Sequence, residues 1–225
     1  MNRSDSKNKV AAVIPFYNES RTINEVIEKT SKHVHFIFAV DDGSTDNSVE
    51  QITAIEKVQI VTVRENRGKG FALRTGMNAA LNTGYNKILT LDADLQHNPD
   101  EIPLFLDGLK NYHIVIGNRL NNLKGMPLHR RMSNKITSKL LSIKTGQGII
   151  DSQCGFRAYR SEILKNIQTV KNGYEAESEI LIIAAKKNYK IGFVDITTIY
   201  GTERSKMNGF KATFDFVKLL FYSSI

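Results

Sequence analysis

Asp92 and Asp94 stand one residue apart, directly after the apolar run Ile88–Leu91. In a strand, residues i and i+2 share a face, and a tight turn would bring the two carboxylates closer still. Gln96 continues the same spacing. Three oxygen-bearing side chains suit a hard cation such as Mg²⁺ or Mn²⁺, and Mg²⁺ usually completes its coordination with water and substrate phosphates. The spacing therefore predicts a metal site that binds a nucleotide diphosphate.

The alternative is that the two aspartates only mark the end of a strand and cap the next helix. Asn98 and Pro99 already suit the N-cap and the first position of that helix, so the cap does not require Asp92 or Asp94. Short Asp-x-Asp patterns are nevertheless common by chance, and on spacing alone neither interpretation is favoured.

The composition limits the class of protein. The chain has 225 residues, of which 41% are hydrophobic and 24% charged, and this suits one large globular domain or a domain with a small appendage. A single cysteine excludes an internal disulfide framework and fits a reducing compartment. The sequence contains no apolar stretch of about 18 residues that could span a bilayer. Residues 1–9 are polar and charged, which predicts a flexible lead-in rather than a signal peptide.

The net charge of +8 favours acidic partners, among them nucleic acid, anionic lipid and phosphorylated substrates. Nucleic acid is the weakest of these, because the basic residues are dispersed and aromatic residues are not interleaved with them. We therefore expect no nucleic-acid partner.

The candidate residues must be positioned by strands and helices that alternate along the first half of the chain. Strands are predicted at Val10–Pro15, His35–Val40, Val58–Val63 and Ile88–Leu91. Helices are predicted from a capping box of Thr22 and Glu25, from Ser44 or Thr45 through Ile55, from Phe71 to Thr83 and from Asn98 to Lys110. This alternation predicts an α/β fold with a mostly parallel sheet and helices on both faces, and such sheets bind ligands at the carboxyl ends of their strands. Tyr17, Asp42 and Asp94 all fall at those ends.

The second half of the chain alternates less regularly. Strands are predicted from Ile114, where the strand delivers Arg119, then within Asp151–Tyr159, where a turn enters a short strand, and at Ile191–Tyr200. Helices are predicted at Leu128–Thr145, at Ser161–Ile167, from Tyr174, and over residues 207–225, where the pattern is amphipathic and of a kind that can associate with a membrane. Carboxylates in the first turn of a helix are favoured by its dipole, so Glu175, Glu177 and Glu179 need no catalytic explanation.

The helix predicted at Leu128–Thr145 carries two stripes at steps of four residues. Its apolar stripe contains Leu128, Met132, Ile136 and Leu140, and the cationic stripe beside it contains Arg131, Lys135 and Lys139. This pattern is typical of a helix that lies on an anionic membrane surface. The alternative, which periodicity alone favours, is a surface helix that packs its apolar stripe on the sheet.

Six sequence blocks in order resemble the family 2 glycosyltransferases with the GT-A fold, and most closely their polyprenyl-phosphate sugar transferases of the dolichyl-phosphate mannose synthase type. The blocks lie at Val13–Glu19, Val40–Asp46, Asn66–Gly70, Asp92–His97, Gly117–Arg119 and Gln153–Arg157. The resemblance extends from Val13 to about Lys206, and it implies one GT-A domain over residues 10–206 with a Rossmann-like sheet.

The resemblance also implies a role for each matching residue. Pro15, Tyr17, Glu19 and Asp42 would hold the nucleoside, with Arg67 and Lys69 as further donor contacts. Asp92, Asp94 and Gln96 would bind Mg²⁺ or Mn²⁺ at the donor diphosphate, with Asp92 alternatively facing the sugar or the ribose. Arg119, with Arg130 or Arg131, would bind the acceptor phosphate, for which guanidinium geometry is well matched. The role of Arg204 is left open, because its spacing after Tyr200 is shorter than in the family.

The implied activity is an inverting, metal-dependent transfer from GDP-mannose or a UDP-hexose to a polyprenyl phosphate, by a cytoplasmic enzyme peripheral to the cytoplasmic face of the membrane. A phosphate acceptor is already an anion and hardly needs a general base. Glu175 or Glu177 would serve as the base if the acceptor were a saccharide hydroxyl, which is one alternative function. The other is a non-catalytic nucleotide-binding module that docks on a membrane or partner.

Overall fold

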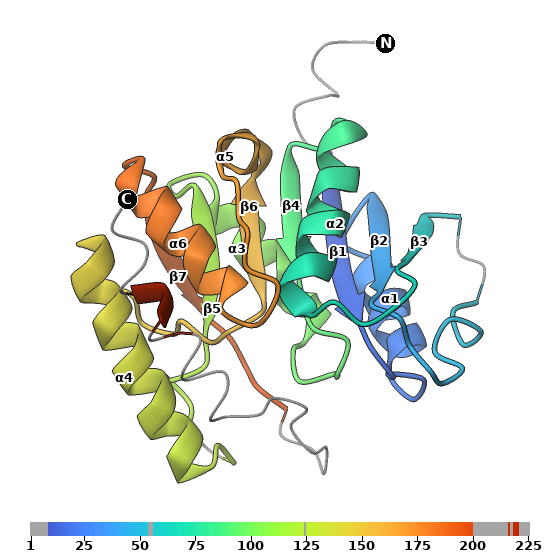
Figure 1. Cartoon of the computed structure of the whole chain (residues 1–225), viewed down its shortest axis with the longest axis horizontal. Helices are drawn as coiled ribbons and strands as arrows, with labels where there is room; N and C mark the ends of the chain where they lie inside the picture. The colour runs from blue at the N-terminus through green and yellow to red at the C-terminus, as the bar shows by residue number, and fades with distance from the viewer. Residues whose placement is uncertain (1–8, 54–55, 124, 200–215, 217, 221–225) are drawn as a thin grey trace.

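The computed structural model describes residues 9–53, 56–123, 125–199, 216 and 218–220 (Figure 1). Their strands are β1 (Val10–Phe16), β2 (Phe36–Asp41), β3 (Val58–Thr62), β4 (Lys87–Thr90), β5 (Ile114–Asn118), β6 (Arg157–Arg160) and β7 (Ile191–Asp195). They form one sheet in the order β3-β2-β1-β4-β6-β5-β7, in which only β6 runs antiparallel to its neighbours. The predicted mostly parallel sheet is confirmed. We call the edge formed by the carboxyl ends of β1, β2, β4 and β5, with the loops that follow them, the rim.

Helices cover both faces of this sheet, as predicted. They are α1 (Ile23–Ser31), α2 (Lys69–Asn82), the 3₁₀ turn η2 (Pro99–Glu101), α3 (Ile102–Gly108), α4 (Leu128–Thr145), α5 (Ser161–Asn166) and α6 (Ala176–Lys186). α2 and α6 contact each other on one face, and α1 and η2 contact each other on the other (Figure 1). α2 lies very close to the sheet, because a Cβ at Gly76 would be 2.4 Å from Val13 Cγ1 and 2.8 Å from Val40 Cγ2.

The prediction of a helix from Ser44 through Ile55 is wrong. The described residues of this segment, up to Thr53, form turns and bends. Serine side chains of this segment, among them Ser44, one of the two expected caps, bind the β1–α1 loop instead. Ser44 Oγ accepts a hydrogen bond from Asn18 N at 3.0 Å, and Ser48 Oγ accepts one from Glu19 N at 2.8 Å. Side chains of this type often compete with helix formation in this way. The result is a fixed loop beside the carboxyl end of β1.

The predicted capping box at α1 is also wrong, whereas the cap predicted at Asn98 is confirmed. Thr22 is the N-cap of α1, but its hydroxyl donates to the carbonyl of Glu19 and caps no helix amide, while Glu25 pairs with Lys29. Asn98 Oδ1 accepts from Asp100 N at 3.1 Å, and Pro99 begins η2. Asp92 and Asp94 are therefore not needed as caps.

α4 spans the predicted residues, but it packs on the molecule with its polar side. Asn134, Thr137 and Ser138 are buried, while Leu128, Met132 and Ile136 are 70%, 57% and 56% exposed. The alternative in which the apolar stripe packs on the sheet is therefore wrong. Figure 1 shows α4 at one side of the molecule, away from α1 and α2.

The predicted helix at residues 207–225 lies mostly outside the described residues, as do Arg204 and nearly all of the lead-in at residues 1–9. Residue 216 and residues 218–220 are helical, and Phe216 and Leu219 are buried. Lys144 of α4 donates a hydrogen bond to the carbonyl of Leu220 at 2.9 Å. Among the described helices, none is both long and apolar enough to cross a membrane.

Candidate active site

The strand register brings the separate sequence blocks to one rim. Phe16 of β1 pairs with Asp41 of β2, and Val13 of β1 pairs with Thr90 of β4. Only the first half of β1 pairs with β4, so β4 ends at Thr90 while β1 continues to Phe16. β6 runs in the opposite direction, so its first residue, Arg157, pairs with Thr90 and reaches the same edge. The rim therefore receives side chains from parallel strands and from the loop before β6.

Asp42 joins the end of β2 to the entrance of α2. Its carboxylate is buried and accepts hydrogen bonds from Arg67 N at 3.0 Å and Gly68 N at 2.8 Å. Burial raises the pKa of Asp42 above its usual value, although both amide contacts lower it. Each carboxylate oxygen has two acceptor positions, so Asp42 can hold this loop and still accept a hydrogen bond from a ligand.

Lys69, in the first turn of α2, links Asp92 to α6. Its Nζ lies 2.6 Å from Asp92 Oδ1 and 3.1 Å from Glu177 Oε2. Burial lowers the pKa of Lys69, but the two carboxylates outweigh burial and raise it well above its usual value. Burial raises the pKa of Asp92, whereas the charges of Lys69 and then His97 lower it. The net result is a pKa below the usual value. Lys69 and Asp92 are thus charged, and a cation of the protein already neutralises the first aspartate of the Asp-x-Asp motif.

Arg157 is a second buried cation at this site. It is fully buried, and it donates hydrogen bonds to the carbonyls of Cys154, Glu177 and Ser152 at 2.7, 2.9 and 2.8 Å. Its Nε is also 3.5 Å from Glu177 Oε1. Glu177 therefore lies between Lys69 and Arg157. No role was predicted for Arg157, although a charged residue after Phe156 at the start of a buried strand was the available signal.

Asp94 forms a tight turn rather than a continuation of β4. The strand ends at Thr90, and Asp94 Oδ1 accepts a hydrogen bond from Gln96 N at 3.1 Å. Leu95, between them, has a φ of 58°, which is rare for a leucine and marks a strained backbone. The expectation that Gln96 follows the strand spacing is therefore wrong. The turn occurs where the two carboxylates were predicted to converge.

The donor atoms of this segment fit a hard cation that shares its coordination with a substrate. Asp92, Asp94 and Gln96 offer only oxygen ligands, and Asp92 is already paired with Lys69. Among the described residues, no cluster of three or more His, Cys, Asp or Glu side chains could hold a metal by itself. Mg²⁺ that is bound together with phosphates usually has too few protein ligands to complete its coordination shell.

Arg119 and Arg131, both predicted to bind the acceptor, hold different parts of the chain. Arg119 follows β5 and pairs with Asp151, with Nε 2.8 Å from Oδ2 and Nη2 2.9 Å from Oδ1. Arg131 donates to the carbonyl of Met126 at 2.8 Å and to that of Leu123, in the loop before α4. A joint grip of the two arginines on one phosphate stays a prediction.

The nucleoside contacts predicted on β1 also stay predictions. Pro15 lies within β1, and Tyr17 and Glu19 follow its carboxyl end at the rim. The structure thus brings these residues, Asp42 and the Asp-x-Asp turn to the same edge of the sheet. The glutamates at the start of α6 have structural contacts: Glu175 accepts from Gly173 N, and Glu179 accepts from Val170 N and Lys171 N.

Replacing Gly155 by alanine is expected to destabilise the chain. A Cβ at Gly155 would lie 2.5 Å from Asp92 Oδ2, and Asp92 cannot easily move because Lys69 holds it. Overpacking of this kind costs about 1–3 kcal/mol, or about 2–4 °C in melting temperature per kcal/mol for a chain of this size. Calorimetry of Gly155→Ala measures the shift. Gly148→Ala is the control, because its Cβ would have no neighbour within 4 Å. Equal melting temperatures of the two variants would show that Asp92 is not confined.

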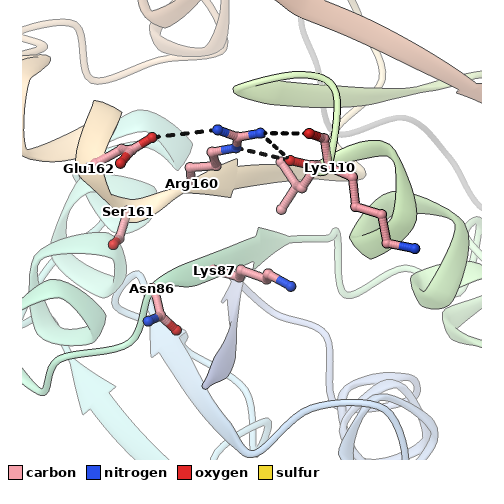
Figure 2. A pocket seen from close by; sticks show the side chains of 7 residues that line it. Asn86, Lys87, Lys110, Arg160, Ser161 and Glu162 are labelled. Atoms are coloured by element: carbon pink, nitrogen blue, oxygen red, sulfur yellow. Dashed lines mark hydrogen bonds and ion pairs between the residues drawn. The ribbon is translucent and has the colours of Figure 1, made fainter. Parts of the chain in front are cut away.

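A surface hollow of about 310 Å³ lies at the opposite end of the strands (Figure 2). Lys87 begins β4 and pairs with Arg160 at the end of β6, far from the rim end of these strands. Figure 2 shows the Arg160 guanidinium directed at the carbonyl of Lys110 and at Glu162. The guanidinium also donates hydrogen bonds to the carbonyl of Leu109. These contacts join β6 to the segment after α3, and the hollow contains none of the predicted site residues.

Comparison with known proteins supports the interpretation of the rim. The family model described as glycosyl transferase family 2 matches residues 11–168. A UDP-N-acetylglucosamine–dolichyl-phosphate N-acetylglucosaminyltransferase from Methanococcus voltae is 35% identical over 221 residues, which cover 88% of this chain and 88% of that protein. An undecaprenyl-phosphate 4-deoxy-4-formamido-L-arabinose transferase from Proteus mirabilis is 29% identical over 221 residues, which cover 91% of this chain and 65% of that protein.

The fold is similar to that of a solved glycosyltransferase. Glucosyl-3-phosphoglycerate synthase from Mycobacterium tuberculosis, crystallised with Mn²⁺ and UDP-glucose, superposes with a TM-score of 0.73 at 21% identity. The superposition covers 98% of this chain and 80% of that one. This similarity confirms the predicted GT-A fold.

Proposed function

Because the chain belongs to glycosyl transferase family 2 and is a glycosyltransferase, we propose that it moves a sugar from a nucleotide-diphosphate donor to a polyprenyl phosphate. The observation that carries the proposal is the rim itself. Asp42, the Asp92–Asp94 turn and Arg119 come from three different strands and meet at one edge of the sheet. Two relatives whose names specify polyprenyl-phosphate acceptors support the choice of acceptor.

On the donor side, Pro15, Tyr17, Glu19 and Asp42 hold the nucleoside, and Arg67 and Lys69 lie at the entrance of α2 beside it. Asp94, with Asp92 or Gln96, holds Mg²⁺ or Mn²⁺ against the diphosphate. A bound cation of this kind neutralises the charge that develops on the leaving diphosphate. The solved structure with Mn²⁺ and UDP-glucose supports a divalent ion in this fold.

On the acceptor side, the environment of Glu177 favours a phosphate over a hydroxyl. A general base needs an accessible carboxylate near the acceptor, but Glu177 is buried between Lys69 and Arg157. An acceptor phosphate needs no base, because its oxygen is already ionised. That oxygen forms a bond to the anomeric carbon as the bond to the diphosphate oxygen breaks, so the configuration inverts. Arg119 binds the phosphate and orients it for this attack.

A thermal-shift screen with GDP-mannose, UDP-glucose and UDP-N-acetylglucosamine, each with Mn²⁺, tests the donor side. A donor present at 100 times its dissociation constant stabilises the folded chain by about 2.7 kcal/mol. We expect one donor to raise the melting temperature, and to do so less when EDTA is present. No shift with any of the three donors would contradict binding of a donor of this class.

We also propose that the enzyme is peripheral to the cytoplasmic face of the membrane, and that α4 lies on the lipid surface. The exposed apolar residues of α4 are Leu128, Met132, Ile136, Leu140 and Ile143. Lys135 and Lys139 are exposed on the same helix and complement anionic lipid headgroups. Contiguous apolar patches exposed to water usually mark a surface that binds a partner or a membrane. The proposed acceptor is itself a membrane lipid.

Serine substitutions on this face are expected to weaken membrane binding without unfolding the chain. The double variant Met132→Ser/Ile136→Ser removes two half-exposed apolar side chains, each contributing about 1 kcal/mol when buried in lipid, so binding should weaken about tenfold or more. Co-sedimentation with vesicles that contain phosphatidylglycerol measures the change. Leu104→Ser is the control, because Leu104 is also exposed but lies on α3. Equal binding of the double variant and the wild type would contradict the assignment of α4.

A further inference from the structure

Asp151 is a fully buried carboxylate for which no role was predicted from the sequence. Its side chain accepts five hydrogen bonds: three from Arg119 (N, Nε and Nη2, at 3.1, 2.8 and 2.9 Å), one from Asn134 Nδ2 at 2.6 Å and one from Gln153 N at 3.2 Å. Burial raises the pKa of Asp151, but the Arg119 contacts outweigh burial and hold it below its usual value. The carboxylate is therefore charged and fully engaged.

The two side-chain contacts from Arg119 fix the plane of its guanidinium. Nε and Nη2 donate to different oxygens of Asp151, which is the paired geometry that orients an arginine most strictly. Arg119 N donates to the same carboxylate, so the backbone and the end of the side chain are held together. The side chain is only 14% exposed. An arginine held in this way loses little conformational freedom when it binds an anion.

The held arginine follows the carboxyl end of β5, at the same edge of the sheet as the Asp-x-Asp turn that follows β4. The strand that carries Arg119 is also fixed at its end, because Asn118 Nδ2 donates to Asp195 Oδ1 of β7 at 2.6 Å. Asp151 thus orients a cation at the edge of the sheet that also carries the Asp-x-Asp turn.

We propose that Asp151 is a positioning residue for the transfer reaction: it orients Arg119 toward the acceptor phosphate without touching either substrate. This inference rests on the proposed function. The competing explanation is that Asp151 only fastens its loop to α4 through Asn134. A purely structural role would change donor and acceptor kinetics together, whereas a positioning role acts on the acceptor alone.

Asp151→Asn keeps the shape of the side chain and removes its charge. With farnesyl phosphate as the acceptor and the most stabilising of the three donors, we expect the KM for farnesyl phosphate to rise about tenfold to 100-fold, because a small displacement of an orienting group has effects of this size. The KM for the donor should change less than about twofold, since Asp151 contacts none of the proposed donor residues. Thr137→Val is the control, because Thr137 is on the same buried face of α4 but bonds to Ser152 rather than Asp151.

Asn134→Ala is the second variant, because Asp151→Asn removes the charge from a buried network and can prevent folding. It deletes one partner of Asp151 and leaves the Arg119 pair in place, so a smaller increase in the acceptor KM is expected. If the folded variants have the same acceptor KM as the wild type, the inference is overturned while the transferase function stands. If Asp151→Asn does not fold, Asn134→Ala alone decides this comparison. Absence of transfer by the wild type with all three donors would overturn the proposed function, and the inference with it.

Discussion

Asp94→Asn is expected to reduce sugar transfer by about 100-fold or more. The substitution keeps an oxygen that can accept the hydrogen bond from Gln96 N, so the turn at Leu95 is preserved and only the charge is removed. A cation at the diphosphate supplies several kcal/mol of stabilisation to the leaving group, and each 1.4 kcal/mol corresponds to about tenfold in rate. Initial rates measured at several Mn²⁺ concentrations show the loss, together with a weaker dependence on the metal.

Asp107→Asn is the matched control for this substitution. Asp107 is an exposed aspartate on α3 that pairs with the nearby Lys110, and we expect its loss to leave the rate unchanged. The melting temperature of Asp94→Asn should also equal that of the wild type. Undiminished transfer by a folded Asp94→Asn would exclude the Asp-x-Asp turn as the metal site.

Arg157→Met is expected to cause the largest loss of stability, about 3–5 kcal/mol. The variant leaves the carbonyls of Ser152, Cys154 and Glu177 without their donor, and it leaves the Glu177 carboxylate with Lys69 as its remaining cation. For a chain of this length the melting temperature should fall by roughly 10 °C. Urea denaturation followed by circular dichroism measures the free energy of unfolding directly.

Two further variants identify the cause of that loss. Arg160→Met lies at the other end of β6, where the side chain is half-buried and its partner Glu162 is exposed, and it should cost clearly less. Adding Glu177→Gln to Arg157→Met removes the carboxylate that has lost one of its two cations, so the double variant should be more stable than Arg157→Met alone. If Arg157→Met costs no more than Arg160→Met, the buried ion pairs do not stabilise the rim.

The sequence predicted most of what periodicity and order along the chain determine. Apolar runs located the buried strands at Val10, at Ile88 and at Ile114, and alternation with helices predicted that their carboxyl ends share one edge. α4 was predicted with its observed bounds, Leu128–Thr145, because its repeat of four is regular. The family resemblance, carried by motifs in a fixed order, was confirmed by the comparisons.

The features that the sequence could not predict depend on contacts between distant segments. The turns after Ser44 replace a helix because Asn18 and Glu19 donate to Ser44 and Ser48. The direction of β6 has no local signal, since the residue types of a four-residue strand do not show which way it runs. The outward apolar face of α4 follows from Asn134, whose partner Asp151 lies 17 residues later.

The candidate site likewise combines features that could be predicted from the sequence with features that could not. The residue types of the Asp-x-Asp turn and their place at the end of a strand could be predicted from the sequence. The pairing of Asp92 with Lys69, and of Arg119 with Asp151, could not, because each joins segments that only the folded sheet brings together. Predicted roles for individual residues therefore need the variants described above.

The most direct test of the proposed function is transfer of a radiolabelled sugar to undecaprenyl phosphate in detergent with Mn²⁺. We expect one of GDP-mannose, UDP-glucose and UDP-N-acetylglucosamine to yield a labelled, organic-soluble phosphodiester with inverted anomeric configuration, and free saccharides to remain unlabelled. Labelled saccharide without labelled lipid, or no labelled lipid with any of the three donors, would contradict the proposed acceptor.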